Sequence, residues 1–305
     1  GQFGNFRTSL GVDLRSYRGY HYRTLNNLMG LDGYYSTGNK NSNGQIINTT
    51  INASPFNNTG LNGPKIDYYN VGVVGWQGLN GLVEYNKDGK YNAVLQGGLS
   101  NQSFQREDYF DQPEMPISDV HNQLGGYAKG GVNYNISDVH NLFVNTGYIS
   151  RQAQFGAVFP NYANVVNPDL ENEEIISFEV GYGYNAKDLT INVNAYSTIW
   201  GNRFQTVSLS NSQGVDGSAQ FSDIDVRHNG IELEADYFAT SKLRLKAMVS
   251  LGDWRYTKDF TAALFDDNQE QIGEGTLYLK GAKVGDNSVW FGFGRTWNAS
   301  LKYNF

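Results

Sequence analysis

The feature that most constrains this chain is an alternation of apolar and polar residues over runs of about ten residues. In LNGLVEYNKDGKYNAVLQGGLS (79–100), alternate positions of 79–85 are Leu, Gly, Val and Tyr, and alternate positions of 91–99 are Tyr, Ala, Leu, Gly and Leu. Asp88 and Gly89 lie between the two runs. Successive side chains of a strand point to opposite faces, so this stretch predicts a β-hairpin with one apolar and one polar face.

The same pattern recurs along the chain and separates short turns from long polar connections. Short turns between alternating runs begin at residues 86, 137, 185 and 239. Longer connections are expected at 29–65, 104–122, 152–173, 203–225 and 256–272. If neighbouring strands are antiparallel, all short turns lie at one end and all long loops at the other. This asymmetry is typical of outer-membrane barrels.

Strand length favours a membrane barrel over a soluble sandwich. Runs such as 90–104 and 188–203 exceed the ~5–6 residues of an average soluble strand and reach the ~9–11 of a membrane-spanning one. The sequence predicts an all-β, antiparallel transmembrane barrel with about eleven or twelve strands in this chain and no amphipathic helix. A soluble β-sandwich enzyme or adhesin is the alternative that folding in water without detergent would support.

Composition excludes several other classes. The chain has 305 residues, no cysteine and a net charge of −7, so disulfide scaffolds, cysteine metal sites and nucleic-acid partners have no support. No apolar run reaches the ~18 residues of a membrane-spanning helix. Four dispersed histidines give no ligand spacing, and FDDNQE (265–270) is expected to be a hairpin tip rather than a cation loop. We therefore expect no enzymatic activity, no metal site and no cofactor.

Aromatic and charged residues are predicted to mark the two faces of the barrel. Arg7, Arg15, Arg244 and Lys246 fall on the polar faces, where they would line the lumen or contact a plug. Tryptophans and tyrosines near strand ends are expected to form an interfacial girdle. These residues are Trp200, Trp254, Tyr256, Tyr278, Trp290 and Trp297.

Two stretches resemble TonB-dependent outer-membrane receptors. NVVNPDLENEEIISFEVGYGY (164–184) resembles the Asn-Pro-x-Leu-x-x-Glu segment that precedes a barrel strand in that family, with Asn172 in place of the usual proline. The matching positions are Asn167, Pro168, Asp169, Leu170, Glu173 and Glu179. The ending FGFGRTWNASLKYNF is similar to the closing strand, most like that of Bacteroidota members. There the terminal aromatic and alternating apolar residues, here Trp297, Leu301, Tyr303 and Phe305, act as the signal for barrel assembly.

The resemblance has departures that shape the expected domain organisation. Family members carry an N-terminal plug and an energy-coupling box, and neither is recognised in residues 1–305. Such receptors have about 22 strands around a plugged lumen, so eleven or twelve strands would not close the wall. We expect residues 1–305 to be the C-terminal part of the barrel, with the plug and N-terminal strands absent from this chain. Lookalikes also have further strands after LYLKGAKVGD, so a segment is expected to be missing between Asp286 and Asn287.

The resemblance implies a receptor in the outer membrane of a Gram-negative bacterium that takes up a scarce nutrient: a chelate, an oligosaccharide or a peptide. Its implied partners are membrane lipid, the plug and remaining barrel, an inner-membrane energy-coupling protein and a surface lipoprotein lid. The expected contacts to substrate are aromatic residues of the long connections. They are Tyr34, Tyr35, Phe56, Phe104, Phe110, Phe155, Phe159 and Phe221.

A non-transporting barrel that serves as the scaffold of an envelope complex remains the alternative. The full gene discriminates, since a plug and a coupling box support transport and their absence favours the scaffold.

Overall fold

The computed structural model describes residues 1–52, 54, 56, 59–210, 216–266 and 270–284, and the backbone of 295–303. Nearly all regular structure is strand, and the helices are single turns. The strands are β1 (Gln2–Phe3), β2 (Phe6–Arg23), β3 (Tyr34–Ser36), β4 (Gln45–Ile47), β5 (Ile66–Lys87), β6 (Tyr91–Asp108), β7 (His121–Asn135), β8 (His140–Arg151), β9 (Glu173–Asn185), β10 (Leu189–Ser210), β11 (Asp216–Phe238), β12 (Leu243–Tyr256), β13 (Phe260–Asp266), β14 (Gln271–Leu277) and β15 (Arg295–Tyr303). The helical turns are α1 (Thr59–Asn62), α2 (Phe155–Val158) and the 3₁₀ turn η1 (Pro160–Tyr162).

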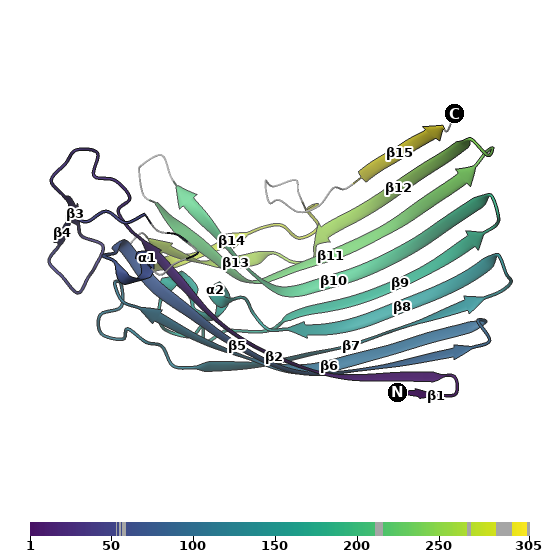
Figure 1. Ribbon diagram of the computed structural model, residues 1–305, viewed down its shortest axis with the longest axis horizontal. Helices are drawn as coiled ribbons and strands as arrows, with labels where there is room; N and C mark the ends of the chain where they lie inside the picture. The colour runs from purple at the N-terminus through teal and green to yellow at the C-terminus, as the bar shows by residue number, and fades with distance from the viewer. Residues whose placement is uncertain are drawn as a thin grey trace.

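One antiparallel sheet of thirteen strands holds the chain together, in the order β1-β2-β5-β6-β7-β8-β9-β10-β11-β12-β15 with β13 and β14 attached to β11. It is strongly curved and open, so it forms part of a barrel wall (Figure 1). The strands of the wall follow chain order because each one pairs with its neighbour through a tight turn or a long outer connection. The predicted all-β antiparallel fold is confirmed.

The four predicted short turns are also confirmed. They join β5 to β6, β7 to β8, β9 to β10 and β11 to β12. All four lie at the end of the sheet where β1 begins and β15 ends, and the long connections lie at the other end (Figure 1). We call these the turn end and the loop end.

The convex face of the wall carries a continuous apolar belt. Across the strands, Val12 pairs with Leu79, Leu79 with Leu99, and Leu99 with Gly126. The belt leucines are unusually open, with Leu10 77%, Leu99 75% and Leu124 75% exposed. So large an apolar surface indicates a face made for lipid. The alternate residues, which point to the concave face, are mostly polar.

Aromatic rings border the belt at the turn end. Phe6 packs on Tyr85 at a ring-centroid distance of 4.9 Å, and Tyr91 stacks on Tyr134 at 5.0 Å. Tyr237 stands at the same end and is 43% exposed. Amphipathic rings favour the level of lipid headgroups, so this row fits a membrane interface.

The predicted girdle was wrong for Trp200 and Trp254. Both belong to the concave series of their strands, since Trp200 follows Thr198 and Trp254 pairs with His228. Their indole N–H groups donate to Glu173 at 3.0 Å and to the Tyr196 hydroxyl at 3.3 Å. The alternation of side chains along each strand places both tryptophans on the concave face, and these hydrogen bonds hold the indole rings there. Tyr256 is 5% exposed, which also removes it from a lipid interface.

The predicted loop at 203–225 was wrong as well. β10 and β11 continue pairing from Gln205–Phe221 to Ser210–Asp216, beyond irregularities at residues 200–205. The local shift of register breaks the alternation and hides the strand signal in the sequence. β13 pairs with this extension, and their apolar residues enclose a small core that includes Val226, Phe260 and Ala262.

The remaining connections contain short elements. Segment 24–65 holds the β3–β4 hairpin and α1. β13 and β14 pair on either side of FDDNQE, whose residues 267–269 lie outside the described residues. The expected missing segment between residues 286 and 287, together with Trp290 and Phe305, lies outside the described residues. In the described residues, no helix has the length and apolarity to cross a membrane.

Candidate functional site: the concave wall and outer cavity

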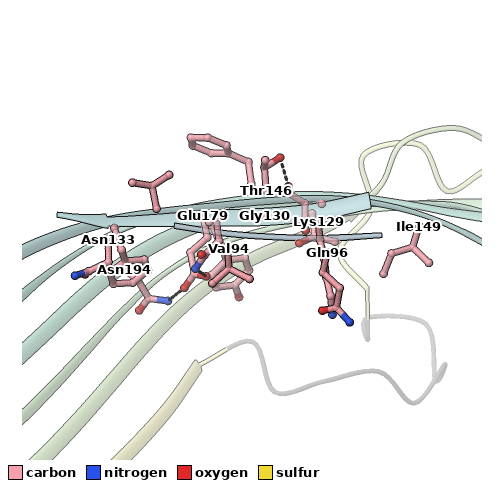
Figure 2. A pocket seen from close by; sticks show the side chains of 18 of the residues that line it. Val94, Gln96, Lys129, Gly130, Asn133, Thr146, Ile149, Glu179 and Asn194 are labelled. Carbon is pink, nitrogen blue, oxygen red and sulfur yellow. Dashed lines mark hydrogen bonds between the residues drawn. The ribbon is translucent and has the colours of Figure 1, made fainter. Parts of the chain in front are cut away.

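The concave wall offers a pocket near mid-sheet with polar and apolar lining residues and a volume of about 740 Å³. Gln96, Ile149 and Asn194 project from one side of the sheet and Thr146 from the other (Figure 2). Glu179 of β9 accepts hydrogen bonds from Asn194 at 2.7 Å and from Asn145 at 3.1 Å. Strand alternation places Glu179, Asn194 and Asn145 on the same face of the sheet.

A second carboxylate lies next to Glu179 on this wall. Glu232 of β11 accepts from Ser250 at 3.4 Å and shares the Asn194 amide at 3.4 Å. Among the described residues, neither Glu179 nor Glu232 has an ion-pair partner. Glu84, by contrast, forms an ion pair with Arg7 at 3.5 Å. Two half-buried carboxylates that accept hydrogen bonds only from neutral groups favour a cationic group in the space on the concave side.

A larger cavity, of about 830 Å³, lies on the concave side toward the loop end. We call it the outer cavity. One side is formed by β2, β5 and β6, and the opposite side by β10, β11 and β13. The segment with α2 and η1 lines it as well. Its lining residues include Tyr17, His21, Phe155, Tyr162, Ser208 and Gln220.

The loop that lines the cavity is held in a constrained conformation. Asn161 and Tyr162 have φ values of 54° and 57°. The left-handed region costs about 1–3 kcal/mol for a non-glycine residue, and such strain concentrates at functional sites. Tyr162 is 68% exposed in this conformation. Phe155 lies against the bare backbone of Gly72, where a Cβ would come within 3.2 Å of its ring.

A buried ion pair clamps two connections beside the cavity. Arg106 donates to Asp108 at 2.6 Å and to the side-chain oxygen of Asn164 at 2.7 Å. Asn164 donates in turn to the Met115 carbonyl at 2.7 Å. Arg106 is 4% and Asp108 1% exposed. Segments 109–120 and 159–170 are therefore tied to each other and to β6.

Asp108 organises the start of segment 109–120. Its Oδ1 accepts the backbone N–H of Phe110 at 2.9 Å and of Asp111 at 2.7 Å. Burial and the nearby Asp108 raise the pKa of Asp111. The charge of Asp108 is balanced by Arg106, so the cavity wall gains no free cation from this pair.

A second hydrogen-bonded cluster lies on the convex side beyond the belt. Glu107 accepts from Arg18 at 2.6 Å and from the Tyr109 hydroxyl at 2.6 Å. The bond to Glu107, reinforced by burial, raises the pKa of Tyr109 to about 12. The folded state therefore favours the neutral phenol of Tyr109 at this end of β6.

The structure separates the eight predicted substrate contacts into three groups. Phe155 and Phe159 line the outer cavity, although Phe159 is 3% exposed. Tyr34, Tyr35 and Phe56 are exposed in segment 24–65. The other three pack inside the chain: Phe104 beneath α2, Phe110 against Tyr69, and Phe221 in the core between β11 and β13.

Sequence reasoning missed Tyr17, His21 and Tyr162 as cavity residues. Tyr17 and His21 belong to the polar face of a strand predicted to line the lumen, so their parity was the available signal. Trp297, Leu301 and Tyr303 of the predicted assembly signal lie in β15, opposite Val249, Leu245 and Leu243 of the apolar face. In the described residues, no cluster of His, Asp and Glu could hold a metal ion.

The sequence matches the family described as TonB dependent receptor-like, beta-barrel, over residues 2–305. This chain belongs to the TonB-dependent receptor family. Members are transport receptors of the outer membrane of Gram-negative bacteria and not enzymes. No curated protein matches the sequence closely enough to count as a relative.

Solved structures show the same fold. The copper transporter OprC is similar at a TM-score of 0.60 and 14% identity, covering 87% of this chain and 41% of that one. The ferric-catecholate import receptor Fiu from K12 E. coli is similar at 0.53 and 12% identity, covering 86% and 40%. The chain thus spans about two fifths of the length of these receptors.

Proposed function

We propose that this chain is the C-terminal part of the barrel of an outer-membrane receptor that imports a scarce nutrient. The observation that carries the proposal is the two-faced wall: an exposed apolar belt outside, a polar concave side within, and a cavity where the long connections gather. The belt would face lipid. The outer cavity would hold the nutrient after capture.

The concave wall would seat a plug domain of the same receptor. Glu179 and Glu232 offer two carboxylates that no described cation neutralises, so a basic side chain of the plug is the matching partner. An inner-membrane energy-coupling protein would act on the plug, and a lipoprotein lid on the outer loops would complete capture. An origin in Bacteroidota stays a prediction.

The contacts to substrate are narrowed by burial. We propose Phe155 in the outer cavity and the exposed Tyr34, Tyr35 and Phe56 as aromatic contacts. Phe104, Phe110, Phe159 and Phe221 would act mainly by positioning loops and strands, since each is at most 8% exposed.

The test is nutrient uptake by cells that lack the receptor gene. Uptake of labelled oligosaccharides, peptides and ferric chelates is compared with and without the restored gene, and again after the proton-motive force is collapsed. The proposal predicts energy-dependent uptake of one class that the gene restores. Unchanged uptake of every class, together with loss of an envelope complex, would instead identify a scaffold.

A further inference from the structure

The outer cavity has a mixed chemistry that limits what it can bind. Its aromatic surface comes from Tyr17 on β2 and from Phe155 and Tyr162 on the segment with α2 and η1. Tyr17 is 60% and Tyr162 68% exposed, so their rings are open to a ligand. Aromatic faces are electron-rich and attract the polarised C–H groups that a sugar ring presents on one side.

The polar part of the lining is dominated by uncharged side chains. Asn70, Thr206, Ser208, Ser218 and Gln220 supply amides and hydroxyls. Such groups both donate and accept, as sugar hydroxyls do. They come from strands on both sides of the cavity, so a ligand lying across it would meet hydrogen-bonding groups along its length.

The charges of the cavity do not suit a polyanionic chelate. The described lining residues include one Arg and one Asp. Arg106 is committed to Asp108 and Asn164, and the carboxylate of Asp266 accepts the N–H of Glu270 at 2.8 Å. A ligand with several negative charges would be desolvated there without a matching cation. No Met or Cys is among the described lining residues, so a soft metal ion has no ligand set.

The cavity also offers a peptide few of the features by which proteins commonly bind one. Where β5 lines the cavity it pairs with β2 on one side and with β6 on the other, so this strand offers no free edge for strand addition. A C-terminal carboxylate would require a cation, and the only Arg among the described lining residues is already engaged. The volume of about 830 Å³ is in the usual range for a small organic ligand.

We propose that the outer cavity binds a neutral oligosaccharide, with Tyr17 and Tyr162 stacking on sugar rings and the amides and hydroxyls of β5, β10 and β11 binding their hydroxyls. This assignment rests on the proposed function, since it names the nutrient class of the same site. Tyr17 and Tyr162 would contact the ligand from two separate elements, β2 and the η1 turn.

The experiment uses the complete receptor that carries this chain, purified in detergent. Isothermal titration is performed with maltohexaose, cellohexaose, xylohexaose and mannohexaose, with an uncharged hexapeptide and a ferric tris-catecholate as the other probes. The variants are Tyr17→Ala and Tyr162→Ala. The control is Tyr20→Ala, on the same strand as Tyr17 but on the convex face. Heat-modifiable gel mobility checks that each variant is folded.

At least one hexasaccharide is expected to bind, and each cavity variant is expected to raise its Kd about three- to tenfold. Tyr20→Ala should leave the Kd unchanged. Binding of the peptide or the chelate without any sugar would overturn the oligosaccharide assignment and leave nutrient import intact. So would the absence of sugar binding in a receptor whose gene restores energy-dependent uptake. If the Kd for the sugar is the same in wild type and in both cavity variants, the assignment of the binding site to the outer cavity is wrong.

Discussion

Removing the Arg106 side chain should open the connections beside the outer cavity. Asp108 is 1% exposed and would keep its two backbone N–H donors but lose its cation. Breaking a buried pair by deleting one partner costs about 3–5 kcal/mol. Since ~1.4 kcal/mol is a factor of ten, Arg106→Met should increase local opening of segments 109–120 and 159–170 by about two to three and a half orders of magnitude.

Hydrogen–deuterium exchange of the full receptor measures this opening directly. Faster exchange is expected in peptides covering both segments, including the amides of Phe110 and Asp111, with no change in the belt strands. Asp108→Asn should also destabilise the segments, because it leaves Arg106 buried without a counter-charge. The double variant Arg106→Met/Asp108→Asn should recover much of the protection, since no uncompensated charge remains.

The matched control is Arg255→Met. Arg255 pairs with Asp253 at 2.9 Å with the same two-residue spacing, but both side chains are exposed. Exposed pairs contribute little, so exchange around β12 should not change. Exchange in 109–120 that is equal for wild type and Arg106→Met would refute the role assigned to the buried pair. The role would also be refuted if Arg106→Met and Arg255→Met increased hydrogen–deuterium exchange equally, each in its own segment.

Three further outcomes are expected. Leu95→Arg, in mid-belt and 64% exposed, should cost about 2–4 kcal/mol of stability in lipid vesicles, whereas Gln96→Arg on the concave face should cost much less; equal losses in urea unfolding would contradict the facing. Because the folded pKa of Tyr109 is raised to about 12 from 10.0, its neutral form adds stability below pH 10 that is lost as pH rises towards 12. Proteolysis of segment 109–120 should therefore increase over that window in wild type more than in Tyr109→Phe, and identical profiles would exclude the hydrogen bond to Glu107. Glu179→Gln should lower energy-dependent uptake while the Kd at the outer cavity stays unchanged, and a change in Kd alone would place Glu179 with the ligand rather than the plug.

Local pattern was enough to predict the wall. Period two in 79–99 specifies which side chains face outward, and Asp88-Gly89 specifies the turn, so β5 and β6 follow directly from sequence. The same rule also contained the correct facing of Trp200 and Trp254. At these two tryptophans strand parity, and not the general preference of the residue type for a membrane interface, decides the facing.

The cavity required information that no local window contains. Tyr17 and Gln220 are brought to one cavity by the curvature of a whole sheet, which depends on every intervening pair of strands. The continuation of β10 and β11 through 203–225 was hidden by irregularities at residues 200–205. The burial of Phe104 depends on α2, a single turn too short to leave a periodic signal.

The orientation of the wall can be tested most directly along β6. The chain has no cysteine, so single Cys substitutions at 91–99 each add one labelling position to it. Spin labels in the receptor reconstituted in lipid are then exposed to oxygen, which concentrates in the bilayer, and to a water-soluble nickel chelate. We predict an alternation with a period of two: residues 91, 93, 95, 97 and 99 favour oxygen, and 92, 94, 96 and 98 do not. Accessibility to the nickel chelate at both parities, or no alternation, would contradict a wall with one face in lipid.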